Sequence, residues 1–310
     1  MTKPLWSPSA GRVAASNLAA FMAFLAPRHG EFKDFAALHR WSIADTAAFW
    51  SELWDFAGLV GDKGAQPWLA DETKMPGAQF FPAGHINYAE NALRRAGGTQ
   101  ELVFTGEDKV ASRTTLAQVR DDAGRFQRFL KACGINAGDR IAAVLPNLPQ
   151  SIVALLATTS IGAVWSSCSP DFGAQGIIDR FGQISPRVLI VCDGYYYAGK
   201  TLDITDKIIE VLGRVAGVEH VVVVSYLGCA EESAARINQA AGRDIATTYD
   251  EALKRGGPGE IAFARFADGW LLDTGEYAGR PVSVTQLGDG SLLVSDDLVG
   301  AIYRISYDGK

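Results

Sequence analysis

The stretch that decides the fold covers residues 138–201 and reads GDRIAAVLPNLPQSIVALLATTSIGAVWSSCSPDFGAQGIIDRFGQISPRVLIVCDGYYYAGKT. Short apolar runs alternate with segments of helical spacing, and Pro149 and Gly162 stand where a helix would begin and end. Uninterrupted apolar runs are typical of parallel strands covered on both faces. The pattern predicts strands at residues 141–145, 164–167 and 188–191, with helices from Pro149 and over residues 175–183.

A sheet of this kind also predicts where function lies. In open parallel sheets, ligands bind at the carboxyl ends of the strands. We therefore expect the functional residues in the three loops at residues 146–149, 167–173 and 193–201.

Composition excludes several classes of protein. The 310 residues carry a net charge of -6 without a cluster of Lys or Arg, which argues against a nucleic-acid partner. No window approaches the apolar length of a membrane span, and the N-terminus lacks the apolar core of a signal peptide, so we expect a cytoplasmic protein that does not enter the membrane. The irregular spacing of Cys133, Cys168, Cys192 and Cys229 predicts reduced thiols rather than a disulfide framework or a metal site.

The first 95 residues are predicted to form a helical cap. Ser16 is placed to cap one helix, and Ser42 with Asp45 to cap a second over residues 43–56. The second helix carries an aromatic stripe that includes Trp50, which we expect to pack in a core. Further along, we expect a helix to open near Asn87.

A β-hairpin and a further helix are predicted before the organising stretch. The hairpin covers residues 102–113, and Thr114 or Thr115 is expected to cap a long helix that Gly134 ends. After the organising stretch, residues 219–224 read as another strand of the sheet.

Several motifs carry a resemblance to a known family. The runs FFPAGHINYAENALRRA at residues 80–96, GINAGDRIAAVLPN at 134–147 and IGAVWSSCSPDFG at 161–173 resemble the acetoacetyl-CoA synthetases of the acyl-adenylate-forming superfamily. The resemblance covers residues 1–255 and implies a ligase that joins acetoacetate to CoA through an acyl-adenylate, using ATP and magnesium.

The same resemblance implies a CoA pocket formed by residues 169–173 and 193–200. Within it, Lys200, Gly199, Tyr197 and Phe172 are the candidate CoA-binding residues, with Lys200 suited to a phosphate because it follows a glycine at an expected helix entry. Tyr197 stands where acetyl-CoA synthetases carry an Arg. The alternative for Lys200 is a solvated surface lysine.

Residues 194–201, GYYYAGKT, also satisfy the spacing of a P-loop, between an apolar strand and an expected helix. A P-loop NTPase is therefore an alternative function. Against it, the next apolar strand, at residues 220–227, ends without the Asp that would hold magnesium.

The sequence changes character after about residue 263. GRPVSV…DGSLLVSDDLVGAIYRISY alternates polar and apolar residues and predicts an antiparallel β-meander. It resembles the last blade of a quinoprotein sugar or sorbosone dehydrogenase, in which Arg280 would match a position that binds pyrroloquinoline quinone. We do not expect this chain to bind that cofactor, because one blade cannot form the axial pocket.

The sequence as a whole predicts an α/β fold with three parts: a helical cap at residues 1–95, an incomplete ligase subdomain at 96–262 and a β-meander at 263–310. No Ser/Thr/Gly-rich run with a Lys for the ATP phosphates occurs, so the ATP site is expected to be absent and no catalytic residue or metal ligand is assigned. We expect a truncated ligase that cannot adenylate alone. The alternative is a non-catalytic remnant that binds CoA or a partner protein, and exposed strands make self-association another expectation.

Overall fold

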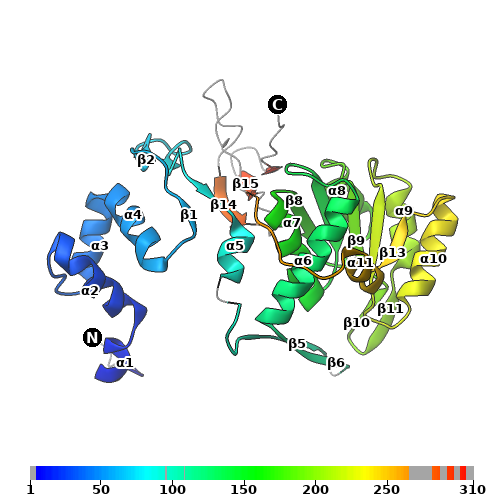
Figure 1. Cartoon of the computed structure of the whole chain (residues 1–310), viewed down its shortest axis with the longest axis horizontal. Helices are drawn as coiled ribbons and strands as arrows, with labels where there is room; N and C mark the ends of the chain where they lie inside the picture. The colour runs from blue at the N-terminus through cyan, green and yellow to red at the C-terminus, as the bar shows by residue number, and fades with distance from the viewer. Residues whose placement is uncertain are drawn as a thin grey trace. The chain divides into compact units, whose positions relative to one another are not determined.

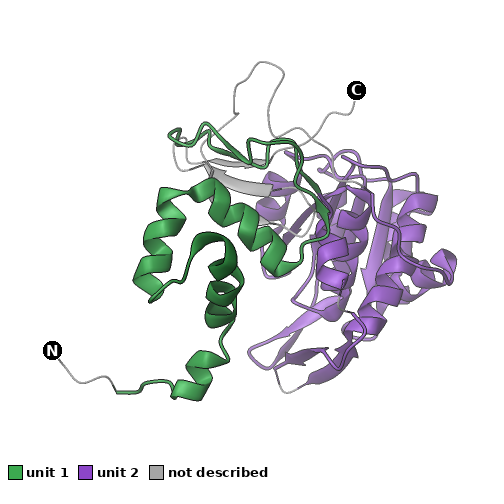
Figure 2. Ribbon diagram, turned by 60° about the vertical axis from the view of Figure 1, so that its left-hand side comes forward, with its two compact units in different colours: residues 1–85 green, residues 86–310 purple. Residues whose placement is uncertain are grey.

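A computed structural model describes residues 5–94, 96–107, 109–264, 281–286, 292–296 and 301–304. The chain divides into two compact units, residues 1–85 and 86–310, which are coloured separately in Figure 2. The predicted division into three domains stays a prediction.

The first unit is helical. Its helices are α1 (Ala10–Ala14), α2 (Asn17–His29), α3 (Phe35–Ala44) and α4 (Thr46–Ala57), followed by the short strands β1 (Gly61–Asp62), β2 (Leu69–Ala70) and β3 (Gln79–Phe80). Strand β4 (His85–Ile86) stands at the boundary between the units. Phe21, Leu25 and Leu38 are buried at the centre of the helices.

The helix caps of this unit confirm one expectation and correct another. The Ser16 side chain caps α2, as predicted. The predicted capping by Ser42 is wrong, because Ser42 lies inside α3 and its hydroxyl donates to the His39 carbonyl. Asp45 alone caps α4, by accepting from the amide of Ala48. Trp50 is 40% exposed and packs edge-on against Phe80, so this part of the aromatic stripe lies at a surface instead of in a core.

The second unit is organised around a five-stranded parallel sheet. Its strands are β7 (Arg140–Val144), β8 (Val164–Cys168), β9 (Val188–Cys192), β12 (His220–Val224) and β13 (Ala246–Thr248), in the order β13-β12-β9-β7-β8. Every residue of β9 is buried, which explains the uninterrupted apolar run in the sequence. The predicted α/β fold with a parallel sheet is confirmed, with β13 added at the edge.

Helices cover both faces of this sheet. The helices are α5 (Tyr88–Leu93), α6 (Leu116–Ala132), α7 (Pro149–Ile161), α8 (Ala174–Phe181), α9 (Thr205–Leu212), α10 (Ala230–Ala241) and α11 (Tyr249–Gly256), and Figure 1 shows how they lie about the strands. Right-handed crossovers place α7 on one face and α8, α9 and α10 on the other, because the chain reverses direction across the sheet after β8. The first face also holds α6 and α11, since α6 packs against both α7 and α11.

Local rules account for the ends of these helices. Thr115 forms a capping box with Gln118 at the start of α6. Pro149 opens α7, and Gly162 ends it with a left-handed φ of 79°. Pro149 and Gly162 were predicted at these positions, and Thr115 is one of the two residues that were expected to cap α6.

Three polar side chains bind the segment that follows α11. Arg128 donates to the carbonyls of Gly256, Gly257, Gly259 and Glu260. Gln127 bonds both backbone groups of Ala262, and the Asn87 amide donates to Ala264 at 2.6 Å. Residues 257–264 are thus held along the surface of α6 and the end of α7 without being a helix or a strand.

Strands β14 (Pro281–Gln286), β15 (Leu292–Asp296) and β16 (Ala301–Arg304) form a three-stranded antiparallel meander, as predicted. Arg280, the candidate quinone-binding residue, lies outside the described residues.

Candidate functional site

The carboxyl edge of the parallel sheet brings the three predicted loops together. β7 lies between β8 and β9, so the chain crosses β7 when it passes from β8 to β9. The loops after β7 and β9 therefore lead to opposite faces, and such a reversal opens the crevice in which sheets of this type bind ligands.

The structure contradicts the P-loop alternative. Residues 194–201 belong to an antiparallel hairpin of β10 (Gly194–Tyr197) and β11 (Lys200–Asp203), and α9 begins only at Thr205. A P-loop would instead run directly into a helix that carries the lysine at its start. Ala198 and Gly199 form the two-residue turn, with φ of 49° and 74°. Positive φ at both turn residues is what a two-residue turn needs to match the right-handed twist of its strands.

This hairpin also changes the physical setting of Lys200. Lys200 was expected at a helix entry, but it is the first residue of β11 and pairs with Tyr197. Both side chains are exposed, Tyr197 by 62%. The Lys200 ammonium makes no hydrogen bond or ion pair with any residue in the described ranges. An exposed cation beside an exposed aromatic ring can bind a phosphate and an adjacent planar group.

A carboxylate that sequence reasoning missed binds the tip of the hairpin. The Glu107 Oε1 accepts from the Ala198 amide at 2.8 Å, and Oε2 accepts from the Gly199 amide at 3.2 Å. Glu107 comes from the turn of another hairpin, formed by β5 (Glu101–Gly106) and β6 (Val110–Thr115). Both hairpins appear at the lower end of the α/β unit in Figure 1.

A second carboxylate holds the base of the hairpin region. Asp193 directly follows β9 and is 1% exposed. Its Oδ1 accepts from the amides of Tyr226 and Leu227, and its Oδ2 accepts from the amide of Cys229. These bonds fix the loop between β12 and α10. A lone Asp directly after an apolar strand was the only sequence signal for this role.

An aromatic cluster joins this loop to both hairpins. The Tyr226 ring lies 5.4 Å from that of Tyr196 on β10 and 6.0 Å from that of Phe104 on β5, edge-on in both cases. A Cβ at Gly106 would lie 2.0 Å from the Tyr226 hydroxyl, so a larger residue there would require the Tyr226 side chain to shift. The hairpins are therefore packed together through aromatic rings along their strands as well as bonded at the tip.

The loop after β8 is fixed by a lysine from α9. Lys207 donates to the carbonyls of Pro170 and Phe172, at 2.7 and 3.0 Å. The Phe172 ring is partly exposed, and the Arg180 guanidinium lies 5.0 Å from its centre. The structure thus places Phe172 after β8, and it places Tyr197, Gly199 and Lys200 after β9. Strands β8 and β9 are the two neighbours of β7 in the sheet.

The cysteines offer no reactive thiol at this edge. Cys133, Cys168, Cys192 and Cys229 are free. Burial raises the pKa of Cys168 and of Cys192 to about 12, so both remain protonated at neutral pH.

The described part of the chain contains no group of three or more His, Cys, Asp or Glu residues that could hold a metal ion. Within the same ranges, every helix is too short or too polar to cross a membrane.

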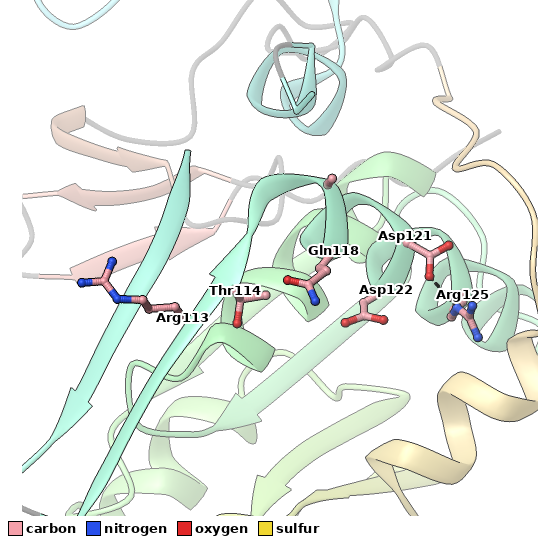
Figure 3. Close-up of a pocket in the computed structure, with 7 residues that line it drawn as sticks. Arg113, Thr114, Gln118, Asp121, Asp122 and Arg125 are labelled. Atoms are coloured by element: carbon pink, nitrogen blue, oxygen red, sulfur yellow. Dashed lines mark hydrogen bonds and ion pairs between the residues drawn. The ribbon is translucent and has the colours of Figure 1, made fainter. Parts of the chain in front are cut away.

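A polar hollow of about 650 Å³ lies elsewhere, along α6 and the end of β6 (Figure 3). Arg113, Asp121, Asp122 and Arg125 line it, and Arg125 pairs with Asp121 at 2.8 Å. Burial and the neighbouring Asp121 raise the pKa of Asp122. None of the candidate CoA-binding residues lines this hollow.

Comparison with known proteins decides the family. The family described as AMP-binding enzyme matches residues 89–264, and the acetyl-coenzyme A synthetase N-terminus matches residues 35–92. The chain belongs to the AMP-binding enzyme family. The α/β unit is accordingly part of the domain of an adenylate-forming ligase.

Relatives of this family are similar over much of the chain. An acetoacetyl-coenzyme A synthetase from Rhizobium meliloti is 40% identical over 295 residues, which are 94% of this chain and 44% of the relative. A malonamoyl-CoA synthetase from Penicillium aethiopicum is 30% identical over 243 residues, 74% of this chain and 32% of the relative. The structure of an acetoacetyl-CoA synthetase from Streptomyces lividans is similar with a TM-score of 0.74 and 34% identity, covering 85% of this chain and 40% of that one.

These matches confirm the resemblance to acetoacetyl-CoA synthetases that the motifs indicated. The chain spans less than half the length of the relatives it matches.

Proposed function

We propose that this chain provides the CoA-binding part of an acetoacetate–CoA ligase. The observation that carries the proposal is the β10–β11 hairpin at the carboxyl edge, where the Lys200 ammonium has no partner among the described residues. The relatives with the name acetoacetyl-CoA synthetase support the choice of acid.

In this proposal, Lys200 binds the 3′-phosphate of CoA, and Gly199 lets the chain turn tightly beside it. Tyr197 and Phe172, whose side chains are exposed, contact the adenine and the pantetheine chain. Because Tyr197 replaces an Arg of the acetyl-CoA synthetases, only one cation is available from this hairpin.

Titration calorimetry with CoA and with 3′-dephospho-CoA tests this assignment. We expect Lys200→Ala to weaken CoA binding about tenfold, the equivalent of one charge-assisted phosphate contact, and to leave 3′-dephospho-CoA binding unchanged. Lys131→Ala, which removes an exposed lysine from the last turn of α6, is the matched control. Equal loss for both ligands would contradict the phosphate contact.

We further propose that the 310 residues alone do not form the acyl-adenylate. The sequence has no Ser/Thr/Gly-rich run with a Lys of the type that holds ATP phosphates in this family. Pyrophosphate release should therefore stay at the level of the control without acid when ATP, magnesium and acetoacetate are supplied. Release that depends on acetoacetate, or on malonamate as the alternative acid, would overturn this proposal.

The two measurements together separate a ligase from a non-catalytic protein that binds CoA. Binding of CoA without pyrophosphate release is the expected combination for this chain.

A further inference from the structure

The tip of the β10–β11 hairpin offers two amides that its own strands cannot satisfy. In a two-residue hairpin, the amides of the turn residues point away from the strand pairing, so Ala198 and Gly199 need acceptors from elsewhere. Water could supply them, since the tip is exposed. Instead, each amide donates to a different oxygen of the Glu107 carboxylate.

Glu107 occupies a position where its backbone is unfavourable. It follows Gly106 in a turn closed by the Lys109 amide and the Gly106 carbonyl, and its φ is 48°. Glycine or asparagine suits this left-handed conformation better than glutamate does. The backbone conformation at this position therefore does not favour glutamate. What the glutamate side chain contributes instead is the long-range hydrogen bonding to the hairpin tip.

The bond fixes the residue that follows it. Lys200 is adjacent to Gly199, and Tyr196, in the strand pair next to Tyr197 and Lys200, packs against Tyr226. With the tip bonded to Glu107 and the next strand pair packed against Tyr226, we expect the backbone of Lys200 to be held in place, while its ammonium stays without a partner in the described residues. Less conformational entropy is then lost when an anion binds.

We propose that Glu107 is a positioning residue, which holds the hairpin tip so that Lys200 is presented to an anionic group of the ligand. This inference rests on the proposed function, in which the anion is the 3′-phosphate of CoA. Glu107 itself does not touch the ligand. Its negative charge opposes the binding of an anion by Lys200. Any gain in affinity therefore comes from the ordered hairpin tip and not from the charge of Glu107.

The test compares Glu107→Ala, which removes both acceptors, with Glu107→Gln, which removes the charge and keeps one acceptor. Glu101→Gln is the matched control, because Glu101 lies on the same hairpin and pairs with Arg113 at its other end. Hydrogen exchange of the Ala198 and Gly199 amides is measured by NMR, and CoA and 3′-dephospho-CoA binding by calorimetry.

We expect Glu107→Ala to speed exchange of both amides at least tenfold and to weaken CoA binding about fivefold, with 3′-dephospho-CoA unaffected. Glu107→Gln should lie between Glu107→Ala and the unchanged chain. Tighter CoA binding by either variant would overturn the proposal, since the carboxylate would then compete with the ligand. Unchanged CoA binding in spite of faster exchange would overturn it as well.

The experiment also separates this proposal from the one on which it rests. If Lys200→Ala leaves CoA binding unchanged while Glu107→Ala weakens it, the phosphate contact of Lys200 is wrong, and so is its presentation by Glu107. If the unchanged chain binds CoA and 3′-dephospho-CoA equally, the proposed contact between Lys200 and the 3′-phosphate is wrong. Unaltered amide exchange in Glu107→Ala would show separately that Glu107 does not hold the hairpin tip.

Discussion

Two neighbouring regions at the carboxyl edge are held by the same chemistry in different surroundings. The loop between β12 and α10 donates three amides to Asp193, and the tip of the β10–β11 hairpin donates two to Glu107. Asp193 is 1% exposed, whereas Glu107 is exposed to solvent. The difference teaches that hydrogen bonds of one type can have different consequences in a buried loop and at an exposed hairpin tip.

The physical reason is the cost of an unsatisfied donor. An amide that loses its acceptor in a buried place loses a hydrogen bond outright, but one at an exposed tip finds water. Bonds to Asp193 should therefore contribute to the free energy of unfolding, and those to Glu107 mainly to the order of the tip.

The largest effect is expected for Asp193→Ala. Three backbone amides lose their acceptor, and we expect the free energy of unfolding to fall by about 3 kcal/mol. Urea denaturation followed by circular dichroism measures this change. Asp171→Ala, an exposed carboxylate in the loop after β8, is the control and should stay close to the unchanged chain. Similar losses for the two variants would show that burial does not distinguish them.

A smaller loss is expected for Gly194→Ala, which crowds the same region. The new Cβ would lie 2.3 Å from Leu227 Cδ1 and 2.4 Å from the Leu202 carbonyl, in the loop bound by Asp193 and in β11. Overpacking of this kind costs about 2 kcal/mol in denaturation experiments. Gly176→Ala is the control, because the space around that glycine in α8 is open. It should be neutral or slightly stabilising, and an equal loss there would refute the packing explanation.

Of the two amide-binding carboxylates, Asp193 and Glu107, the smaller change in thermal stability is expected for Glu107→Ala. Water replaces the lost acceptors at the exposed tip, so the Tm should stay within about two degrees. Differential scanning calorimetry measures it alongside Asp193→Ala. A fall as large as that of the buried variant would mean that Glu107 supports the fold itself.

A third carboxylate, Asp122, sharpens the comparison, because it accepts no amide hydrogen bond from any residue that the structure describes. Burial raises the pKa of Asp122, so ionisation of this group destabilises the folded chain. Asp122→Asn should raise the Tm by about one to two degrees at pH 7. The advantage should vanish as the pH falls below the ordinary pKa of 3.8, where the wild-type carboxyl is protonated in both states. A difference that persists at low pH would contradict this cause.

The sequence predicted the sheet and most helix ends because these depend on near neighbours. The apolar runs at β7, β8, β9 and β12 are buried strands. Thr115, Pro149 and Gly162 act within one turn of their own helices. Ser42 failed as a cap because Asp45, only three residues on, supplied the better acceptor for the start of α4.

The candidate site was predicted less completely. Lys200, Gly199, Tyr197 and Phe172 came from resemblance to a family, and their CoA contacts stay predictions. The spacing of residues 194–201 also fitted a P-loop, although the next apolar strand ends without the Asp that would hold magnesium. The P-loop pattern specifies residue types at a given spacing and does not specify the backbone conformation. In this chain the backbone of these residues forms a hairpin.

By itself, the sequence determined that the chain has a covered parallel sheet, where its carboxyl edge lies and which ligase family it resembles. Burial of apolar runs and capping within a turn are local causes, and they can be read locally. Only the tertiary structure decided that residues 194–203 form a hairpin, that Asp193 binds the loop after β12, and that Glu107 reaches the hairpin tip across 91 positions of sequence. The bonds to Asp193 and Glu107 join segments far apart in sequence, which only the folded chain brings within hydrogen-bond distance.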